Sequence, residues 1–383
     1  MFEDIRPYDD VATCDAMFRF ADHPIREKFN SFLYPGEDST LFRETLRTVT
    51  SVDDFQSSVM SPAIGRIVSL TTKGLTFDGM EYFRDFPKRR YLILSNHRDI
   101  VLDSAFLQHL MVLTSLPTTE IAVGDNLVSI PFVNDLMRSN RMVKVIRSGS
   151  PRELYAASAQ LSDYIRRRIN GRSLDVEDPA SATSGDGGAS IWLAHRQGRT
   201  KNGYDLTEQG LLKMLDMSGR GTFEENFGEL NILPLSISYE YEPCGVRKAV
   251  ENWKRAVNGS YTKAQMEDIE SIITGITQKK GRVHMQFCEP LTSEEIADAA
   301  SFDKNERYRR LAEIIDSRIV DGYHLWETSA SAAAMLEGGC PDADFQAYIE
   351  GELASLPDDC DRDAVRNELL KIFAAPFLRK KSK

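Results

Sequence analysis

The stretch LILSNHRDIVLDSAFL, residues 92–107, places a histidine and three charged residues directly after an apolar run. A histidine can remove a proton from a hydroxyl as a general base, and a carboxylate can fix its tautomer. His97 is therefore the candidate base, and Asp103 is the candidate orienting carboxylate. We expect Asp99 to cap a helix that starts at Ile100. The alternative interpretation of the whole stretch is a helix cap with a histidine beside it by chance.

Basic residues follow two later β-rich runs. Arg147 comes after MVKVI, while Gly198, Arg199 and Lys201 come after IWLA. Guanidinium groups bind phosphate oxygens in pairs, lysine adds a point charge, and glycine lets the backbone approach an anion closely. We take these four residues as candidates for substrate binding, with Arg141 as a weaker candidate that flanks a strand. The alternative is a solvated basic face.

Three regions follow from the hydrophobic pattern. Residues 1–75 have apolar residues at helical spacing, and residues 292–383 are also expected to be helical. Between them, in residues 76–291, short β-rich runs alternate with helical ones. This predicts an α/β domain with a mostly parallel central sheet flanked by helices, and with helical additions at both ends. Residues 172–189 are rich in Gly, Ser, Asp and Ala, so we expect a surface insertion there.

Composition and charge exclude several classes of protein. The net charge of −11 argues against a nucleic-acid partner, and the five scattered cysteines argue against a metal site or a disulfide framework. Apolar runs are too short for a membrane-spanning helix, and the first residues lack the pattern of a secretory signal. We therefore expect a cytoplasmic protein.

Four blocks in order resemble the glycerol-3-phosphate and lysophosphatidate acyltransferase superfamily. They are SNHRDIVLD, GDNLVSIPFVNDLMRSNRMVKVIRS, IWLAHRQGRTKNG and ILPLSISYE, within residues 75–290. The resemblance implies an acyltransferase-type fold and transfer of a fatty acyl group to a hydroxyl of glycerol 3-phosphate or lysophosphatidate. It implies an acyl thioester donor, coenzyme A or acyl carrier protein, as co-substrate. Direct attack of a hydroxyl activated by His97 on the bound thioester needs no metal, and we expect no cofactor. The family roles carry over to His97 as the base, and to Arg147, Gly198 and Arg199.

Two positions depart from the family pattern. Asp103 lies six residues after His97 instead of five, which turns it by about 100° on a regular helix. A bulge or a delayed helix start would have to restore the contact. Gln197 stands where the family has a glutamate. These departures keep two alternatives open: an acyltransferase for another lyso-lipid or alcohol, and a non-catalytic relative that binds lipid or acyl carrier protein.

The end of the chain combines apolar and basic residues. Residues 371–383, KIFAAPFLRKKSK, contain no acid. One interpretation is docking on anionic lipid, which would make the protein peripheral on the inner face of the membrane. The other interpretation is a disordered soluble tail.

Overall fold

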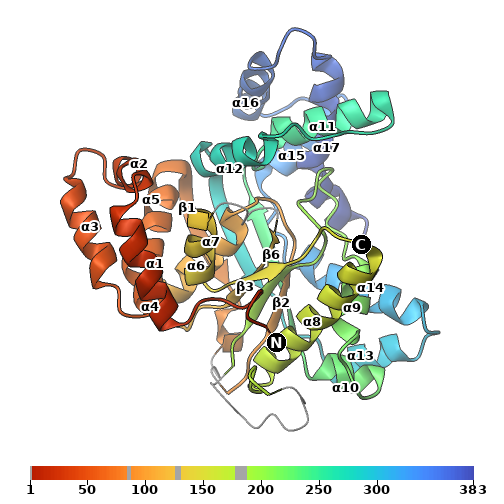
Figure 1. Cartoon of the computed structure of the whole chain (residues 1–383). Coiled ribbons are helices and arrows are strands. Elements are labelled where there is room, and N and C mark those ends of the chain that lie inside the picture. Colours follow the sequence, from red (N-terminus) through yellow and green to blue (C-terminus); the bar gives the residue numbers. More distant parts are fainter. Residues whose placement is uncertain (1, 84–87, 126–130, 177–187) are drawn as a thin grey trace.

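The computed structural model describes residues 2–83, 88–125, 131–176 and 188–383. Within these residues, one central sheet is formed by seven strands (Figure 1): β1 (Thr72–Asp78), β2 (Leu92–Ser95), β3 (Glu120–Gly124), β4 (Met142–Val145), β5 (Ile191–Ala194), β6 (Ile232–Tyr239) and β7 (Gly281–Phe287). Their order across the sheet is β1-β7-β6-β2-β5-β3-β4. Neighbouring strands are parallel except β6 and β7, which are antiparallel. The predicted α/β fold with a mostly parallel sheet is confirmed.

Helices lie before, between and after the strands. Those of the N-terminal region are α1 (Asp10–Asp22), α2 (Ile25–Leu33), α3 (Ser39–Thr48), α4 (Val52–Phe55), the π-helical turn η1 (Gln56–Met60) and α5 (Ser61–Thr71). Those between strands are η2 (Met80–Phe83), α6 (Leu102–Leu113), α7 (Pro131–Ser139), α8 (Pro151–Ile169), α9 (Gln209–Asp216), α10 (Phe223–Gly228), α11 (Gly245–Asn258) and α12 (Glu267–Thr277). After β7 come α13 (Ser293–Ala300), α14 (Glu306–Asp321), α15 (Glu327–Leu336), α16 (Ala343–Ala354) and α17 (Arg362–Lys381).

Apolar side chains cover both faces of the sheet, so the central strands β2 and β6 are buried along their whole length. Successive residues of a strand point to opposite faces. Leu92 and Leu94 of β2 therefore enter one core with side chains of α8, α9, α10, α13 and α14. Ile93 enters the other core with side chains of α5 and α6. The run LIL thus contributes to both cores and fixes β2 in the middle of the sheet.

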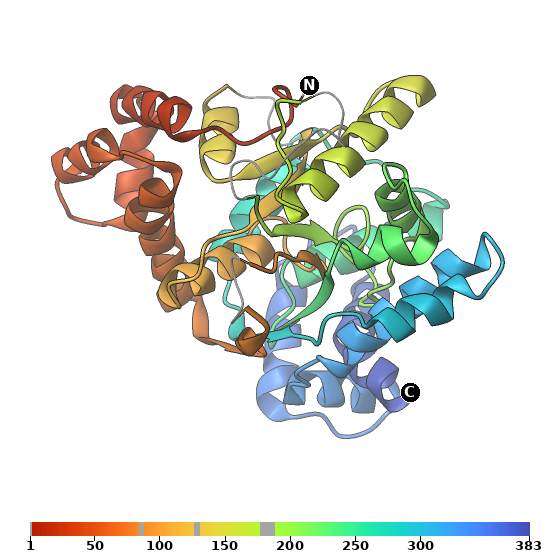
Figure 2. The same ribbon diagram turned by 90° about the horizontal axis from the view of Figure 1, so that it is seen from below.

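The N- and C-terminal helices lie on different sides of the sheet (Figures 1 and 2). Helices α1, α2, α3 and α5 share a separate apolar core, and β1 begins directly after α5 at Thr72. The boundary predicted at residue 75 therefore falls inside β1, whereas the boundary predicted at residue 291 falls between β7 and α13. Most of the predicted insertion at 172–189 lies outside the described residues.

The basic end of the chain is a helix that packs against the rest of the protein. Ile372 and Phe373 of α17 are buried in a core shared with α11, α15 and α16. The Lys380 ammonium donates to the carbonyl oxygens of Asp321 and Tyr323. These contacts hold Ile372 and Phe373 inside the protein, so the segment is an ordered helix and not a disordered tail in this structure.

Candidate functional site

Three neighbouring strands carry the candidate site at their carboxyl ends. β6, β2 and β5 are adjacent and parallel, so they end at the same edge of the sheet. His97 follows β2, residues 195–205 follow β5, and Tyr239 ends β6. The backbone N–H of Thr200 donates to the carbonyl oxygen of His97 at 2.9 Å. Polar residues that follow separate strands in the sequence therefore meet here.

His97 is hydrogen-bonded to Asp103 through its Nδ1 atom. The distance from Nδ1 to Asp103 Oδ2 is 2.9 Å, and the side chains of His97 and Asp103 are 13% and 1% exposed. An ionised carboxylate only accepts hydrogen bonds, so Nδ1 carries the proton in this contact. The lone pair of the neutral imidazole is then on Nε2. This tautomer is the one that can accept a proton from a substrate hydroxyl.

A late helix start closes the six-residue spacing between His97 and Asp103. Helix α6 begins at Leu102, two residues later than expected from the sequence. The chain before it wraps around the Asp103 carboxylate, whose Oδ2 accepts from the backbone N–H groups of Arg98 at 2.6 Å and Asp99 at 3.0 Å. The structure thus meets the condition that the sequence analysis set for this pair.

Asp99 holds the helix start and does not contact the histidine ring. Its Oδ1 accepts from the backbone N–H groups of Val101 and Leu102 at 2.9 and 2.8 Å. Its Oδ2 is buried with no hydrogen-bond partner among the described residues and lies against Gly275 of α12. Burial, followed by the nearby Asp103 charge, raises the pKa of Asp99. Asp99 therefore has the capping contacts predicted for it, although the helix starts later than Ile100.

Tyr239 is a partner of Asp103 that the sequence analysis missed. Its hydroxyl donates to Asp103 Oδ1 at 2.7 Å. Burial and the Asp103 charge raise the pKa of Tyr239 well above its usual value, so the phenol stays a donor. Tyr239 lies near the end of the fourth sequence block, so the sequence did show a hydroxyl group at the end of that predicted strand. Only the order of the strands brings it next to Asp103.

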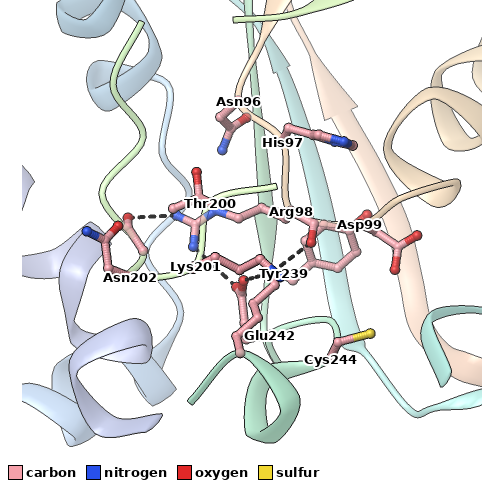
Figure 3. A network of polar contacts seen from close by, with 12 residues as sticks. Asn96, His97, Arg98, Asp99, Thr200, Lys201, Asn202, Tyr239, Glu242 and Cys244 are labelled. Carbon is pink, nitrogen blue, oxygen red and sulfur yellow. Dashed lines mark hydrogen bonds and ion pairs between the residues drawn. The ribbon is translucent and has the colours of Figure 1, made fainter. Parts of the chain in front are cut away.

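Arg98 anchors the other side of the same segment. Figure 3 shows the side chains of His97 and Asp99 on one side of the chain and that of Arg98 on the other. The Arg98 guanidinium donates to Asp205 Oδ2 at 2.7 Å and to Glu242 Oε2 at 3.3 Å. Burial disfavours its charged form, but these carboxylates outweigh burial and raise the pKa of Arg98. No local pattern pointed to Asp205 or Glu242, which lie 107 and 144 residues along the chain.

The loop after β5 carries three predicted substrate-binding residues. Gly198 has φ +71°, a left-handed conformation that favours glycine, and a Cβ there would meet nothing within 4 Å. Arg199 is 7% exposed, and its buried Nη1 has no hydrogen-bond partner among the described residues. Lys201 pairs with Glu251. Burial, then the charge of Arg199, lowers the pKa of Lys201 to about 8. Of the three predicted residues, Arg199 is thus the one with an unused buried donor.

Arg147 and Arg141 lie at opposite ends of the edge strand β4. Arg147 follows its carboxyl end, and its backbone N–H donates to Asp125 at 3.3 Å. Since β5 and β3 separate β4 from β2, the ends of β4 and β2 are about 14 Å apart at the usual strand spacing. Arg141 precedes β4, where it pairs with Asp53 at 2.6 Å and donates to Gln56 at 3.2 Å. The Arg141 guanidinium therefore joins this edge of the sheet to the N-terminal helices, at the end of the sheet away from His97.

A second histidine, His195, lies buried in the same loop and serves the fold. Burial lowers the pKa of His195 to about 3, so its imidazole is neutral near pH 7. Its Nδ1 lies 3.2 Å from the Thr207 hydroxyl, which donates to Asp316 Oδ1 at 2.6 Å. Burial raises the pKa of Asp316 to about 6. This chain of contacts ties the loop after β5 to helix α14.

The described residues offer neither a metal site nor a membrane-spanning helix. No group of three or more His, Cys, Asp or Glu side chains there could hold a metal ion. Nor does any helix in the described part of the chain have the length and apolar character needed to cross a bilayer. The five cysteines are unpaired thiols.

Comparison with known proteins identifies the segment that carries His97. Residues 74–176 match the protein-family model described as Acyltransferase. The matched segment contains His97, Asp103 and Arg147. The predicted resemblance to acyltransferases is confirmed over these residues. The third and fourth blocks lie outside the matched residues.

One solved structure and the curated proteins complete the comparison. The chain is similar to the 1-acyl-sn-glycerophosphate (LPA) acyltransferase PlsC from Thermotoga maritima, with 12% identity and a TM-score of 0.41. The similarity covers 82% of this chain and 95% of that one. No curated protein sequence matches this chain.

Proposed function

We propose that this acyltransferase moves a fatty acyl group from a thioester, acyl-CoA or acyl carrier protein, to a hydroxyl of glycerol 3-phosphate or lysophosphatidate. The observation that carries the proposal is the hydrogen bond between His97 and Asp103 within the matched segment. It leaves Nε2 of His97 as the nitrogen that accepts a proton.

The reaction needs one base and two bound substrates. His97 Nε2 takes the proton of the acceptor hydroxyl as the oxygen attacks the thioester carbonyl carbon. The C–S bond then breaks, the thiolate takes the proton from the imidazolium, and an ester and a free thiol result. Asp103 stabilises the imidazolium in between. General-base catalysis of this kind typically contributes about 10²–10⁴-fold, and positioning of the substrates supplies much of the rest.

The acceptor phosphate is assigned to the loop after β5. The unused, buried Nη1 of Arg199 is a donor for an anionic oxygen, and the open space at Gly198 lets the backbone approach it. Lys201 adds a charge nearby. A charge-assisted hydrogen bond from arginine to phosphate contributes about 1.5–3 kcal/mol. Arg147, at the end of the edge strand β4, adds positive charge that attracts the phosphate to this side of the sheet.

The test is a substrate panel with the purified full-length protein. Acyl-CoA and acyl carrier protein thioesters are each combined with glycerol 3-phosphate, lysophosphatidate, a lyso-aminolipid and a simple alcohol, and thiol release is followed. We expect release that depends on a phosphorylated glycerol acceptor and disappears in His97→Ala. Release with another acceptor alone would make the protein an acyltransferase for a different lyso-lipid or alcohol. Thioester binding without turnover would identify a non-catalytic relative.

A further inference from the structure

The peptide that carries His97 is held from the C-terminal half of the protein. Thr200 donates its backbone N–H to the His97 carbonyl oxygen, and the Lys248 ammonium donates to the Arg98 carbonyl oxygen at 2.7 Å. Lys248 belongs to α11, and its side chain is 1% exposed. Both carbonyl groups of the His97–Arg98 segment therefore have fixed donors.

Lys248 belongs to a closed network of buried charges. Its Nζ lies 2.6 Å from Glu242 Oε1, and Glu242 Oε2 accepts from Arg98 at 3.3 Å. Arg98 in turn pairs with Asp205 at 2.7 Å. Asp205 also accepts from the Asn96 amide at 3.1 Å. Thr200, which donates to the His97 carbonyl oxygen, also donates its hydroxyl to Asp205 Oδ1 at 2.7 Å. Residues 96, 97 and 98 are thus each tied to the network, part of which Figure 3 shows.

Stability alone is a weak reason for such a network. Two cations and two carboxylates are buried here. A buried set of paired charges often stabilises a protein no more than apolar residues of the same volume would. Directional hydrogen bonds do fix one backbone geometry, and that geometry sets where Nε2 of His97 points. In a base-catalysed transfer, a misplacement of about 1 Å can cost roughly 10²-fold in rate.

We propose that Lys248 is a positioning residue for His97. Through Glu242 and the Arg98 carbonyl group, it sets the orientation of the His97 peptide. α11 itself is held by α17 through a shared apolar core that contains Ala249, Leu369 and Phe373. The C-terminal helical region therefore contributes to the active-site geometry although none of its side chains contacts the reacting atoms. This inference rests on the proposed function of His97.

The test compares two buried lysines in the full-length protein. Lys248→Met removes the donor to Arg98 and keeps the volume. Lys280→Met is the matched control, since Lys280 is equally buried and donates to Thr71 and the Gln278 carbonyl oxygen. We expect Lys248→Met to lower kcat by roughly tenfold to a hundredfold with acceptor KM within about twofold. Lys280→Met should keep kcat per folded molecule. Should Lys248→Met fail to fold, Lys248→Met/Glu242→Gln removes both charges and takes its place.

A second readout separates this proposal from the proposed function. The ring nitrogen resonances of His97 report its tautomer and hydrogen bonding without any substrate. We expect them to shift in Lys248→Met and to stay in Lys280→Met. Unchanged kcat and unchanged His97 resonances in a folded Lys248→Met would overturn the positioning role. So would equal changes in both lysine variants. If the wild type turns over no thioester, the proposed function fails, and the resonances alone decide the positioning.

Discussion

Asp103 Oδ2 lies 2.9 Å from His97 Nδ1 although six residues separate the two in sequence. The contact forms because α6 starts only at Leu102 and the preceding backbone folds around the carboxylate. Asp103 accepts hydrogen bonds from the histidine ring, two backbone N–H groups and Tyr239. A buried carboxylate with so many donors is held in one orientation. This orientation favours the His97 tautomer that carries its proton on Nδ1.

Asp103→Asn should reduce kcat far more than Asp99→Asn. An amide at position 103 can present its NH₂ group to Nδ1, which favours the wrong tautomer, whereas Asp99 does not contact the ring. Asp99→Asn should leave the free energy of unfolding unchanged or raise it, because the carboxylate there is buried and half unpartnered. Steady-state kinetics and urea unfolding of both variants test this. A larger loss of kcat in Asp99→Asn would make Asp99 the orienting acid.

Tyr239→Phe should lower both stability and turnover. It leaves Asp103 Oδ1 buried without its donor, which costs about 1–3 kcal/mol of unfolding free energy. We expect kcat to fall by about tenfold, since the carboxylate can then rotate away from His97. Urea unfolding and kcat are measured on the same preparation. Wild-type turnover in the folded variant would mean that Tyr239 only fills the core.

Arg199→Ala should raise acceptor KM more than Arg147→Ala does. Arg199 lies in the loop next to β2 with an unused donor, while Arg147 lies on the edge strand. Loss of about 1.5–3 kcal/mol corresponds to about one to two decades in affinity for a phosphorylated acceptor. Arg199→Lys should recover part of this, because a point charge cannot reproduce the guanidinium fork. Kinetics with each substrate varied in turn test the ranking. If acceptor KM and kcat are unchanged in both alanine variants, these arginines do not bind the acceptor phosphate.

Asp316→Asn should change how stability depends on pH. Burial raises the pKa of Asp316 to about 6, so the folded protein binds its proton more tightly than the unfolded chain does. The stability from this proton is complete below about pH 4 and is lost as pH rises through 6, by about 3 kcal/mol in all. The asparagine cannot ionise, and its Oδ1 can still accept from Thr207. The variant should therefore gain stability over wild type between pH 4 and 7. His195 Nδ1 lies 3.8 Å from Asp316, but burial lowers the pKa of His195 to about 3, so the folded imidazole is neutral over this pH range in both proteins. Urea unfolding at several pH values measures the difference in stability between them. If the difference in unfolding free energy between Asp316→Asn and wild type does not vary with pH, the pKa of Asp316 is not raised.

The sequence predicted those features that local pattern determines. Alternating β-rich and helical runs gave the mostly parallel sheet, and polar residues after the runs gave His97 and the loop at 195–205. Asp103 was preferred over Asp99 because Asp99 was expected to cap the helix, but the residue types left open which of the two acids pairs with His97. Whether Asp103 reached His97 depended on the backbone between them, because the helix start, not the spacing, decides the direction of the side chain.

The remaining features depend on contacts between distant parts of the chain. The order of the strands puts Tyr239 beside Asp103 and leaves Arg147 at the edge, and no local pattern encodes that order. Arg141 was a weaker candidate because it flanks a strand, and the structure places it before β4, at the other end of the sheet from His97. The sequence left lipid docking and a disordered tail as alternatives for the last residues, and it did not show that Ile372 and Phe373 pack into a core with α11, α15 and α16.

The most direct test of the account is acyl transfer by His97→Ala. Turnover of the identified thioester and acceptor pair is measured beside circular dichroism, with Asp99→Asn as a variant of the same segment that spares the ring. The account predicts a folded His97→Ala protein that still binds thioester and whose kcat falls by about 10²–10⁴-fold. A folded His97→Ala protein with wild-type kcat would contradict it.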